Sequence, residues 1–175
     1  MNNKVFYGVI VLIAAGAIGF LVYKNVSSPP EAPTLGSEHA DQGVKHVADI
    51  TQFKYNSNPP SSGDHYQSPS LKGFYEEELP DGNLIHNLEH GYVWVAYRPD
   101  LPADQVQKLK GLFSEPFSDP KFIPSKAIVT KRPNNPAPIS IVSWRWTMNL
   151  DNYDEEELTL FYRQHVSKSP EAAAS

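Results

Sequence analysis

Residues 83–97 read Asn-Leu-Ile-His-Asn-Leu-Glu-His-Gly-Tyr-Val-Trp-Val-Ala-Tyr, a helix-like pattern that runs directly into a strand-like pattern. The part up to Glu89 predicts a short helix, and Gly91 is typical of the residue that ends one. Residues 92–97 are mostly β-branched or aromatic and predict a strand. We therefore expect one helical turn with two histidines at the edge of a small sheet.

The rest of the chain adds two helices and two strands to this unit. Apolar residues at helical spacing predict a helix over residues 102–113, and residues 151–165 begin with an acidic run that suits a helix N-terminus. Residues 127–130 and 139–146 predict strands. The predicted fold class is α+β, with a small, largely antiparallel sheet and flanking helices, preceded by one N-terminal transmembrane helix.

Residues 5–23 are almost wholly apolar, with no charge between Lys4 and Lys24. About 20 apolar residues at ~1.5 Å rise cross a bilayer core of roughly 30 Å. A secretory signal peptide is the alternative, but its apolar region usually has about 7–15 residues. We predict an uncleaved single-pass anchor in the cell membrane, with the globular domain on the extracytoplasmic side. Ala15 and Gly19 form a small-xxx-small pair that would suit a homodimer.

Composition divides the chain into four segments. Residues 1–24 form the predicted transmembrane anchor, and residues 25–43 form a Pro/Ser-rich spacer that we expect to be extended. Residues 44–168 form the predicted globular domain, followed by a flexible tail at 169–175. Within the domain, residues 51–83 are rich in turn formers and also in aromatic residues, which favours an ordered functional loop.

Charge and cysteine content exclude several functions. The 175 residues carry a formal net charge of −5 from scattered acids, with no basic patch, so the electrostatic requirement for nucleic-acid binding is missing. The chain has no cysteine, which excludes thiolate metal ligands and thiol redox chemistry. A metal ion would have to be held by histidine, carboxylate, methionine or backbone oxygen.

His86 and His90 are the strongest candidate metal ligands. Residues four apart on a helix project from the same face, so the two rings can hold one transition-metal ion. Glu89 lies between them, and we expect it to orient a histidine ring rather than to act as a base. The same letters spell the inverted zinc-peptidase motif H-x-x-E-H, but Gly91 ends the predicted helix at once. A structural alternative is that both rings brace the helix against the sheet.

Three further residues are candidate ligands. His65 follows a Pro-Pro-Ser-Ser-Gly turn that would present it rigidly, and we take it as the third ligand. Met148 or His46 is the candidate fourth ligand. Met148 is a soft ligand that would favour Cu(I), although methionine often only fills a gap in a core. We expect His39 and His165 to be surface residues.

Several motifs together resemble a known bacterial family, DUF3105. Residues 55–66 read Tyr-Asn-Ser-Asn-Pro-Pro-Ser-Ser-Gly-Asp-His-Tyr, residues 73–75 read Gly-Phe-Tyr, and residues 84–93 include His-Asn-Leu-Glu-His-Gly. The resemblance covers roughly residues 44–166. Ser61 departs from the family's usual threonine, and Trp146 stands two residues after Trp144, where the family more often has a glycine directly after its tryptophan. The resemblance implies a membrane-anchored or secreted domain and supplies little chemistry.

These observations favour a membrane-anchored extracytoplasmic metal-binding protein rather than an enzyme. Imidazole ligands suit copper and zinc, and copper binds more tightly at a given nitrogen and oxygen site, so we predict copper first and zinc second. The predicted partners are the metal ion, the membrane and a protein that exchanges the metal. Two alternatives remain: a zinc-dependent hydrolase that uses His86, Glu89 and His90, or a metal-free structural or interaction domain.

Overall fold

A computed structural model describes residues 3–27, 33–113 and 125–173. The chain divides into two compact units, Met1–Pro33 and Thr34–Ser175, and each is described by itself. The first unit contains the 25-residue helix α1 (Asn3–Ser27). A transmembrane helix was expected in this region. Within the described residues, no helix combines the length and the apolar character that crossing a membrane requires.

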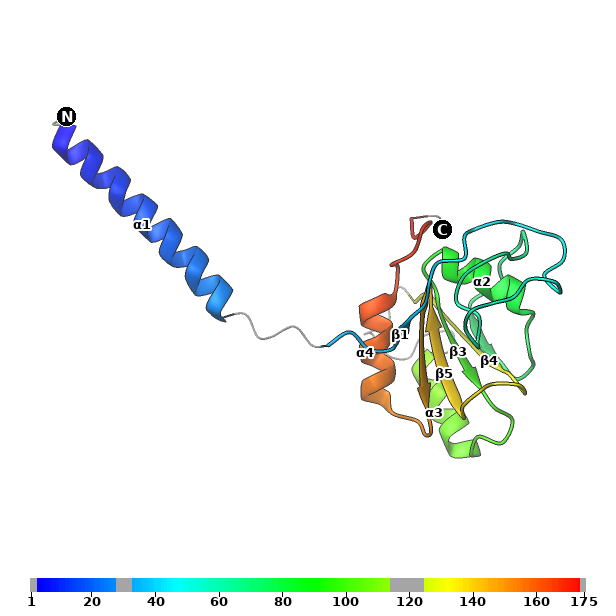
Figure 1. The fold of residues 1–175 in the computed structure, drawn as a ribbon. Helices are drawn as coiled ribbons and strands as arrows, with labels where there is room; N and C mark the ends of the chain where they lie inside the picture. Colours follow the sequence, from blue (N-terminus) through cyan, green and yellow to red (C-terminus); the bar gives the residue numbers. More distant parts are fainter. Residues whose placement is uncertain (1–2, 28–32, 114–124, 174–175) are drawn as a thin grey trace. The chain divides into compact units, whose positions relative to one another are not determined.

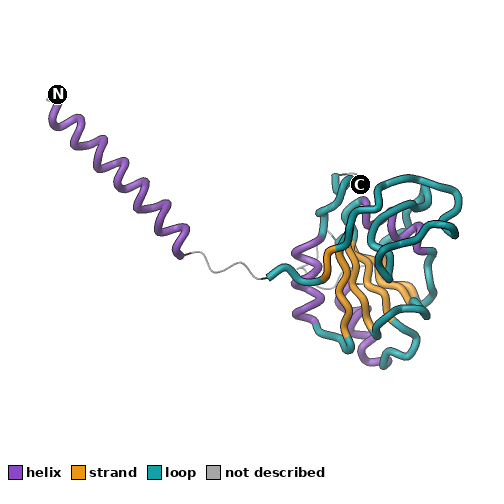
Figure 2. Tube along the Cα trace, in the orientation of Figure 1, coloured by secondary structure: helices purple, strands orange, loops and turns teal. Residues whose placement is uncertain are grey.

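The second unit is an α+β domain (Figures 1 and 2). It is built on one six-stranded sheet. The strand order across the sheet is β1-β6-β5-β3-β4-β2. The strands are β1 (Ser37–Glu38), β2 (Gly73–Tyr75), β3 (Val93–Tyr97), β4 (Ala127–Lys131), β5 (Ile139–Ser143) and β6 (Trp146–Leu150). The helices of this unit are α2 (Asp81–Glu89), α3 (Ala103–Phe113) and α4 (Glu155–His165).

The sheet is mixed, so the prediction of a largely antiparallel sheet was wrong. β3 pairs with β4 in parallel, and β4 also pairs with β2 in parallel, whereas β5, β6 and β1 continue the sheet in antiparallel fashion. Between β3 and β4 the chain passes through α3. Parallel neighbours need such a crossover connection, because a tight turn returns the chain antiparallel.

Residues 139–146 were predicted as one strand, but they hold β5 and the first residue of β6. The two strands form a hairpin in which Ser143 pairs with Trp146. The turn is made by Trp144 and Arg145, and Arg145 has a φ of 67°. Left-handed backbone at a turn is normally signalled by glycine or asparagine, so a Trp-Arg turn gives no sequence signal.

The two faces of the sheet carry separate apolar clusters. On one face, Leu84, Ile85 and Leu88 of α2 pack with Trp94 and its neighbours on the strands. On the other face, α3 and α4 cover the alternate residues of the same strands, including Val93, Val95, Val129 and Ile141. Because side chains alternate along a strand, β3 contributes to both clusters.

α2 is the element that positions the candidate site. Seven of its nine residues are buried: Gly82, Leu84, Ile85, His86, Asn87, Leu88 and Glu89. A helix buried on more than its sheet-facing side must be covered by something else. The irregular segment before it does this, because Tyr66 donates its N–H to Gly82 O at 3.1 Å and Ser70 N–H donates to Asn87 Oδ1 at 2.9 Å.

α2 ends as the sequence predicts. His90 is the C-cap residue, and Gly91 follows it with a φ of 80°. Gly91 N–H donates to Leu88 O at 2.9 Å, and Tyr92 N–H donates to Asn87 O at 3.0 Å, so the last helical carbonyls are satisfied. The chain then enters β3 directly, which places the last turn of α2 at the end of the central strand.

Candidate metal centre

His86 and Glu89 are neighbours on α2, and neither belongs to the set of Leu84, Ile85 and Leu88 that packs on the sheet. Residues three apart on a helix are neighbours on its surface. Their exposed fractions are 6% and 1%, so both polar side chains lie in the interior of the domain. A buried carboxylate needs a cation, a proton or several hydrogen-bond donors to offset its lost hydration. The question is therefore what lies opposite Glu89.

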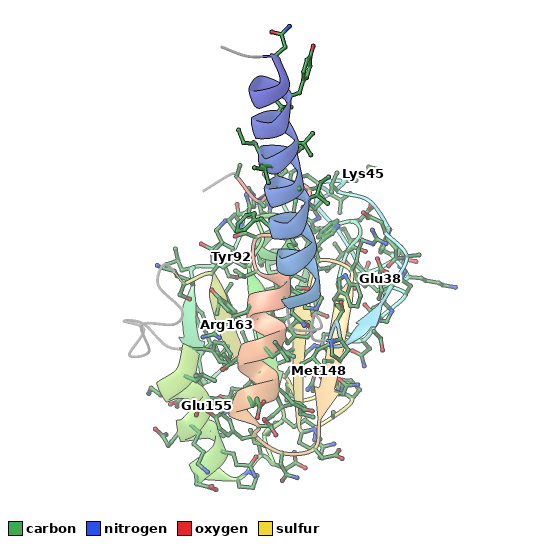
Figure 3. The ribbon with its side chains drawn as sticks, turned by 90° about the vertical axis from the view of Figure 1, so that its left-hand side faces the viewer. Glu38, Lys45, Tyr92, Met148, Glu155 and Arg163 are labelled. Carbon is green, nitrogen blue, oxygen red and sulfur yellow. The ribbon has the colours of Figure 1, made fainter. Side chains whose placement is uncertain are left out.

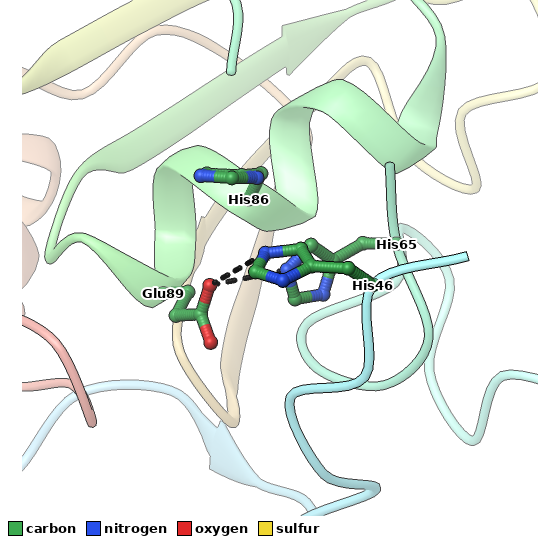
Figure 4. A group of neighbouring side chains, drawn as sticks. All are labelled: His46, His65, His86 and Glu89. Atoms are coloured by element: carbon green, nitrogen blue, oxygen red, sulfur yellow. Dashed lines mark hydrogen bonds and ion pairs between the residues drawn. The ribbon is translucent and has the colours of Figure 1, made fainter. Parts of the chain in front are cut away.

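His46 and His65 supply the groups opposite Glu89 (Figure 4). The two histidines belong to segments that meet in an isolated parallel β-bridge. His65 N–H donates to Lys45 O at 3.0 Å, and Val47 N–H donates to His65 O at 2.8 Å. The ring centroids of His46 and His65 lie 4.7 Å apart. Backbone pairing therefore places both rings over the last turn of α2.

These four residues converge on one point. His65 Nε2 lies 3.1 Å from Glu89 Oε2, and His46 Nε2 lies 3.6 Å from the same oxygen. One ligand atom from each of His46, His65, His86 and Glu89 lies within 4.8 Å of every other. We call these four residues the histidine–glutamate group. Three imidazoles and one carboxylate at this separation are a donor set that suits a first-row transition metal.

The second ring nitrogens of two histidines fix their tautomers. His65 Nδ1 lies 2.8 Å from Gly63 O, and His86 Nδ1 lies 2.8 Å from Tyr66 O. A carbonyl oxygen only accepts, so Nδ1 carries the proton in both rings. In the neutral ring, Nε2 then carries no proton and has an unshared lone pair. In His65 this lone pair faces the carboxylate oxygen Oε2 of Glu89. Two acceptors at 3.1 Å require a proton or a metal ion between or beside them.

The electrostatics of His86 favour the neutral, metal-binding form of its ring. Its pKa is lowered from the ordinary 6.5, first because burial disfavours the charged ring, and further by the nearby His90, His65 and His46. The hydrogen bond to Tyr66 O acts in the opposite direction. A metal ion competes with a proton for the same lone pair, so a ring that resists protonation keeps its donor available.

His90 lies beside this group rather than within it. Its Nε2 is 2.8 Å from His86 Nε2, and the two rings are stacked with centroids 4.7 Å apart and an interplanar angle of 16°. The helical spacing that pointed to this pair does bring the rings together. The ligand atoms that gather around Glu89, however, come from His46 and His65, and His90 belongs to a second set with Glu89 and Glu171.

Met148 lies on the opposite face of the sheet. It pairs with Ile141 in the β5–β6 ladder and packs against the cluster that α3 and α4 cover. In Figure 3 it lies well away from Lys45, the neighbour of His46. The structure therefore does not bring Met148 together with the histidines.

The remaining two histidines have structural contacts. His39 is half-buried, and its Nε2 lies 2.8 Å from Thr147 Oγ1. His165 was expected at the surface, and that prediction was wrong, because the side chain is 4% exposed. Its ring packs on Phe161 and Trp146, and its Nε2 donates to Leu35 O at 2.9 Å.

Glu89 was predicted to orient a histidine ring, and the structure places its carboxylate among the candidate ligand atoms themselves. The spacing His86-x-x-Glu89 already places both side chains on one helix face, and this is the signal that supports a direct ligand. His46 offered a weaker signal, because its position depends on the bridge to His65, a contact between segments 19 residues apart. No local pattern reports such a pairing.

Comparison with known proteins gives a family and little else. No curated protein matches the chain, and no protein of solved structure matches it. The family described as "Protein of unknown function (DUF3105)" matches residues 46–175. This range includes all four residues of the histidine–glutamate group, with His46 at its first position. The chain therefore belongs to the DUF3105 family.

Proposed function

We propose that this domain binds a divalent first-row transition-metal ion through the histidine–glutamate group. The observation that carries the proposal is the orientation of His65 and His86. Each ring uses its Nδ1 proton on a backbone carbonyl, which leaves Nε2 as the available donor atom. Nε2 of His65 lies 3.1 Å from the carboxylate of Glu89, and His86 offers a ligand atom within 4.8 Å of the others in the group. Histidines that bind metals are held in this way, with the other nitrogen donating to a carbonyl or carboxylate.

The donor set favours copper as Cu(II), with zinc second. Three imidazoles and one carboxylate suit both ions, and Cu(II) binds more tightly than Zn(II) at a given site. Cu(I) prefers soft thioether or thiolate ligands. The chain has no cysteine, and Met148 packs on the far face of the sheet, so the argument for Cu(I) loses its support.

Binding fits the arrangement better than hydrolysis does. Catalytic zinc sites keep an open position, whereas four protein donors close a tetrahedral site. Glu89, the only acid of the H-x-x-E-H letters, faces two of the donor histidines, and as a ligand it would not act as a base. His46 is the exposed donor, with 34% of its side chain accessible. We propose that exchange of metal with a partner protein takes place through this ligand.

The test is a metal titration of the full chain with Cu(II) and with Zn(II), read by competition with a chromophoric chelator. His65→Ala, His86→Ala and Glu89→Gln should each weaken binding by more than the roughly 10–100-fold that loss of an outer hydrogen-bond partner causes. His39→Ala is the matched control, because His39 contacts Thr147 instead, and it should bind like the unaltered chain.

Two results would contradict the proposal. The unaltered chain would fail to bind either ion, or the three ligand variants would bind as tightly as the control. Either result would favour the metal-free alternative, in which the buried contact between His65 and Glu89 has a purely structural role.

A further inference from the structure

We infer that Glu89 bridges two metal ions, and that His90 and Glu171 hold the second ion. The inference rests on the proposed function for the first ion, held by the histidine–glutamate group. It concerns three residues, Glu89, His90 and Glu171, which we call the second group. One ligand atom from each lies within 4.8 Å of the others. Glu89 is common to both groups.

The geometry of His86 and His90 suits two adjacent ions. The rings are nearly parallel, with 4.7 Å between their centroids, and their Nε2 atoms lie 2.8 Å apart, at hydrogen-bond distance. His86 belongs to the first group and His90 to the second. Paired metal sites in proteins hold their ions about 3.5–4 Å apart. The two adjacent rings can thus supply one imidazole to each ion, and Glu89 is the residue common to both groups.

Backbone contacts hold Glu171 in place. Glu171 N–H donates to Glu89 O at 3.1 Å, and Ser169 Oγ donates to the same oxygen at 2.6 Å. Ser167 N–H donates to Gly91 O at 2.8 Å. A Cβ on Gly91 would lie 2.7 Å from Ser167 Cα, so the close approach of these segments requires glycine here. The segment that carries Glu171 is thus attached to the end of α2.

Lys126 holds the same segment from the other side. Its Nζ donates to His90 O at 3.0 Å and to Ala172 O at 2.8 Å. The ammonium group of Lys126 therefore joins Ala172, the residue after Glu171, to His90, the residue after Glu89. Both hydrogen bonds are to main-chain oxygens, and the ammonium group also lies 5.9 Å from the centroid of the Tyr92 ring. The exposed Glu171 side chain and the half-buried His90 ring lie next to Glu89 because the main chain holds them there.

The second ion would be more open to solvent than the first, whose group has only His46 exposed. The second group supplies one imidazole and two carboxylates, one of them shared, which leaves coordination positions for water or a small ligand. His90 also lines a pocket of about 320 Å³ whose other walls include Pro69, Leu71 and Tyr92. In the first group, by contrast, His65, His86 and Glu89 are all buried. The second ion should therefore exchange faster than the first.

The experiment counts Cu(II) ions on the full chain by native mass spectrometry and records the electron paramagnetic resonance spectrum of the loaded protein. The unaltered chain should bind two ions with a spectrum that shows magnetic coupling. Glu171→Gln and His90→Ala should each bind one ion with the spectrum of an isolated Cu(II). Glu156→Gln is the matched control, because Glu156 is an exposed glutamate on α4, and it should keep both ions.

The outcomes separate this inference from the proposed function. A single ion on the unaltered chain, or two ions retained in Glu171→Gln, would overturn the bridged pair and leave the first site standing. No bound ion on the unaltered chain would overturn the proposed function itself. Glu171→Gln keeps the backbone contacts of the segment, and circular dichroism of each variant checks that the fold is intact.

Discussion

Single turn residues aim the donors of the histidine–glutamate group. The main-chain oxygens of Gly63 and Tyr66 receive the Nδ1 protons of His65 and His86. Tyr66 also donates its N–H to Gly82 O, so the same residue ties the turn to the first turn of α2. The orientation of the His65 and His86 rings thus depends on the main chain at Gly63 and Tyr66, two residues that are not candidate ligands themselves.

Gly63→Ala tests this dependence. Gly63 has a φ of 116°, and a Cβ there would lie 2.5 Å from Phe53 Cε1, so alanine is both strained and obstructed. We expect a loss of about 1–3 kcal/mol from backbone strain alone, with a further steric cost. The altered carbonyl should weaken metal binding by about 10–100-fold. Thermal unfolding and the chelator competition measure the two effects.

Gly43→Ala is the control for that substitution. Gly43 has a φ of 89° but open space around the position of a Cβ, so alanine brings strain without obstruction. Its loss of stability should be smaller, and its metal affinity should stay near that of the unaltered chain. Equal metal affinity in Gly63→Ala and Gly43→Ala would show that the turn does not aim His65.

At the scale of elements, α2 depends on an ion pair at its start. Arg132 on the segment after β4 donates to both carboxylate oxygens of Asp81, at 2.9 and 3.3 Å, and to Asn58 Oδ1 at 2.8 Å. The guanidinium also lies 5.7 Å from the centroid of the Trp94 ring. One buried arginine therefore connects α2, the preceding irregular segment and β3.

Arg132→Ala should lower the free energy of unfolding by about 2–3 kcal/mol, somewhat less than the roughly 3–5 kcal/mol for breaking a fully buried pair, because the Asp81 side chain is 26% exposed. Arg98→Ala removes a comparable two-bond pair with Asp100, which is 67% exposed, and should cost at most about 1 kcal/mol. Urea unfolding compares the two. Similar losses would show that the Arg132 network adds nothing beyond a surface pair.

Local patterns predicted the elements better than their pairing. Gly91, the acidic start of α4 and the apolar spacing of α3 were readable because helix signals lie within a few residues of each other. The parallel pairing of β3 and β4 depends on a crossover and has no such signal. The same limit applies to the site: the spacing of His86 and Glu89 is local, whereas His46 and Glu171 reach it from distant segments.

At the scale of the whole molecule, the chain has two compact units, and all residues of both metal groups lie in the second. We predict that residues 34–175 alone fold and bind the same number of ions as the full chain, because every residue of both groups lies in this unit. Circular dichroism and the metal titration check this. Loss of binding in the shorter chain would show that the first unit contributes to the site. The extracytoplasmic membrane location stays a prediction from the sequence.

The buried side chain of His165 is hydrogen-bonded to Leu35, near the start of the second unit. This histidine makes the free energy of unfolding depend on pH. Burial lowers the pKa of His165 below 6.5, Lys168 lowers it further, and the bond to Leu35 O opposes the shift. The unfolded chain then binds the proton more readily, so stability present above about pH 6.5 is lost as the pH falls through the folded-state pKa. His165→Gln should show a smaller fall in unfolding free energy between about pH 7.5 and pH 5. An unchanged slope would contradict this.

The division of the sheet into two faces has a consequence for evolution. All four donors of the histidine–glutamate group lie between residues 46 and 89 and on the α2 side of the sheet, whereas α3 and α4 pack on the other side. Apolar residues under α3 and α4 can therefore change together, at constant volume, without altering the donors. That face is thus free to vary independently of the proposed metal site, which constrains only the opposite face of the same strands.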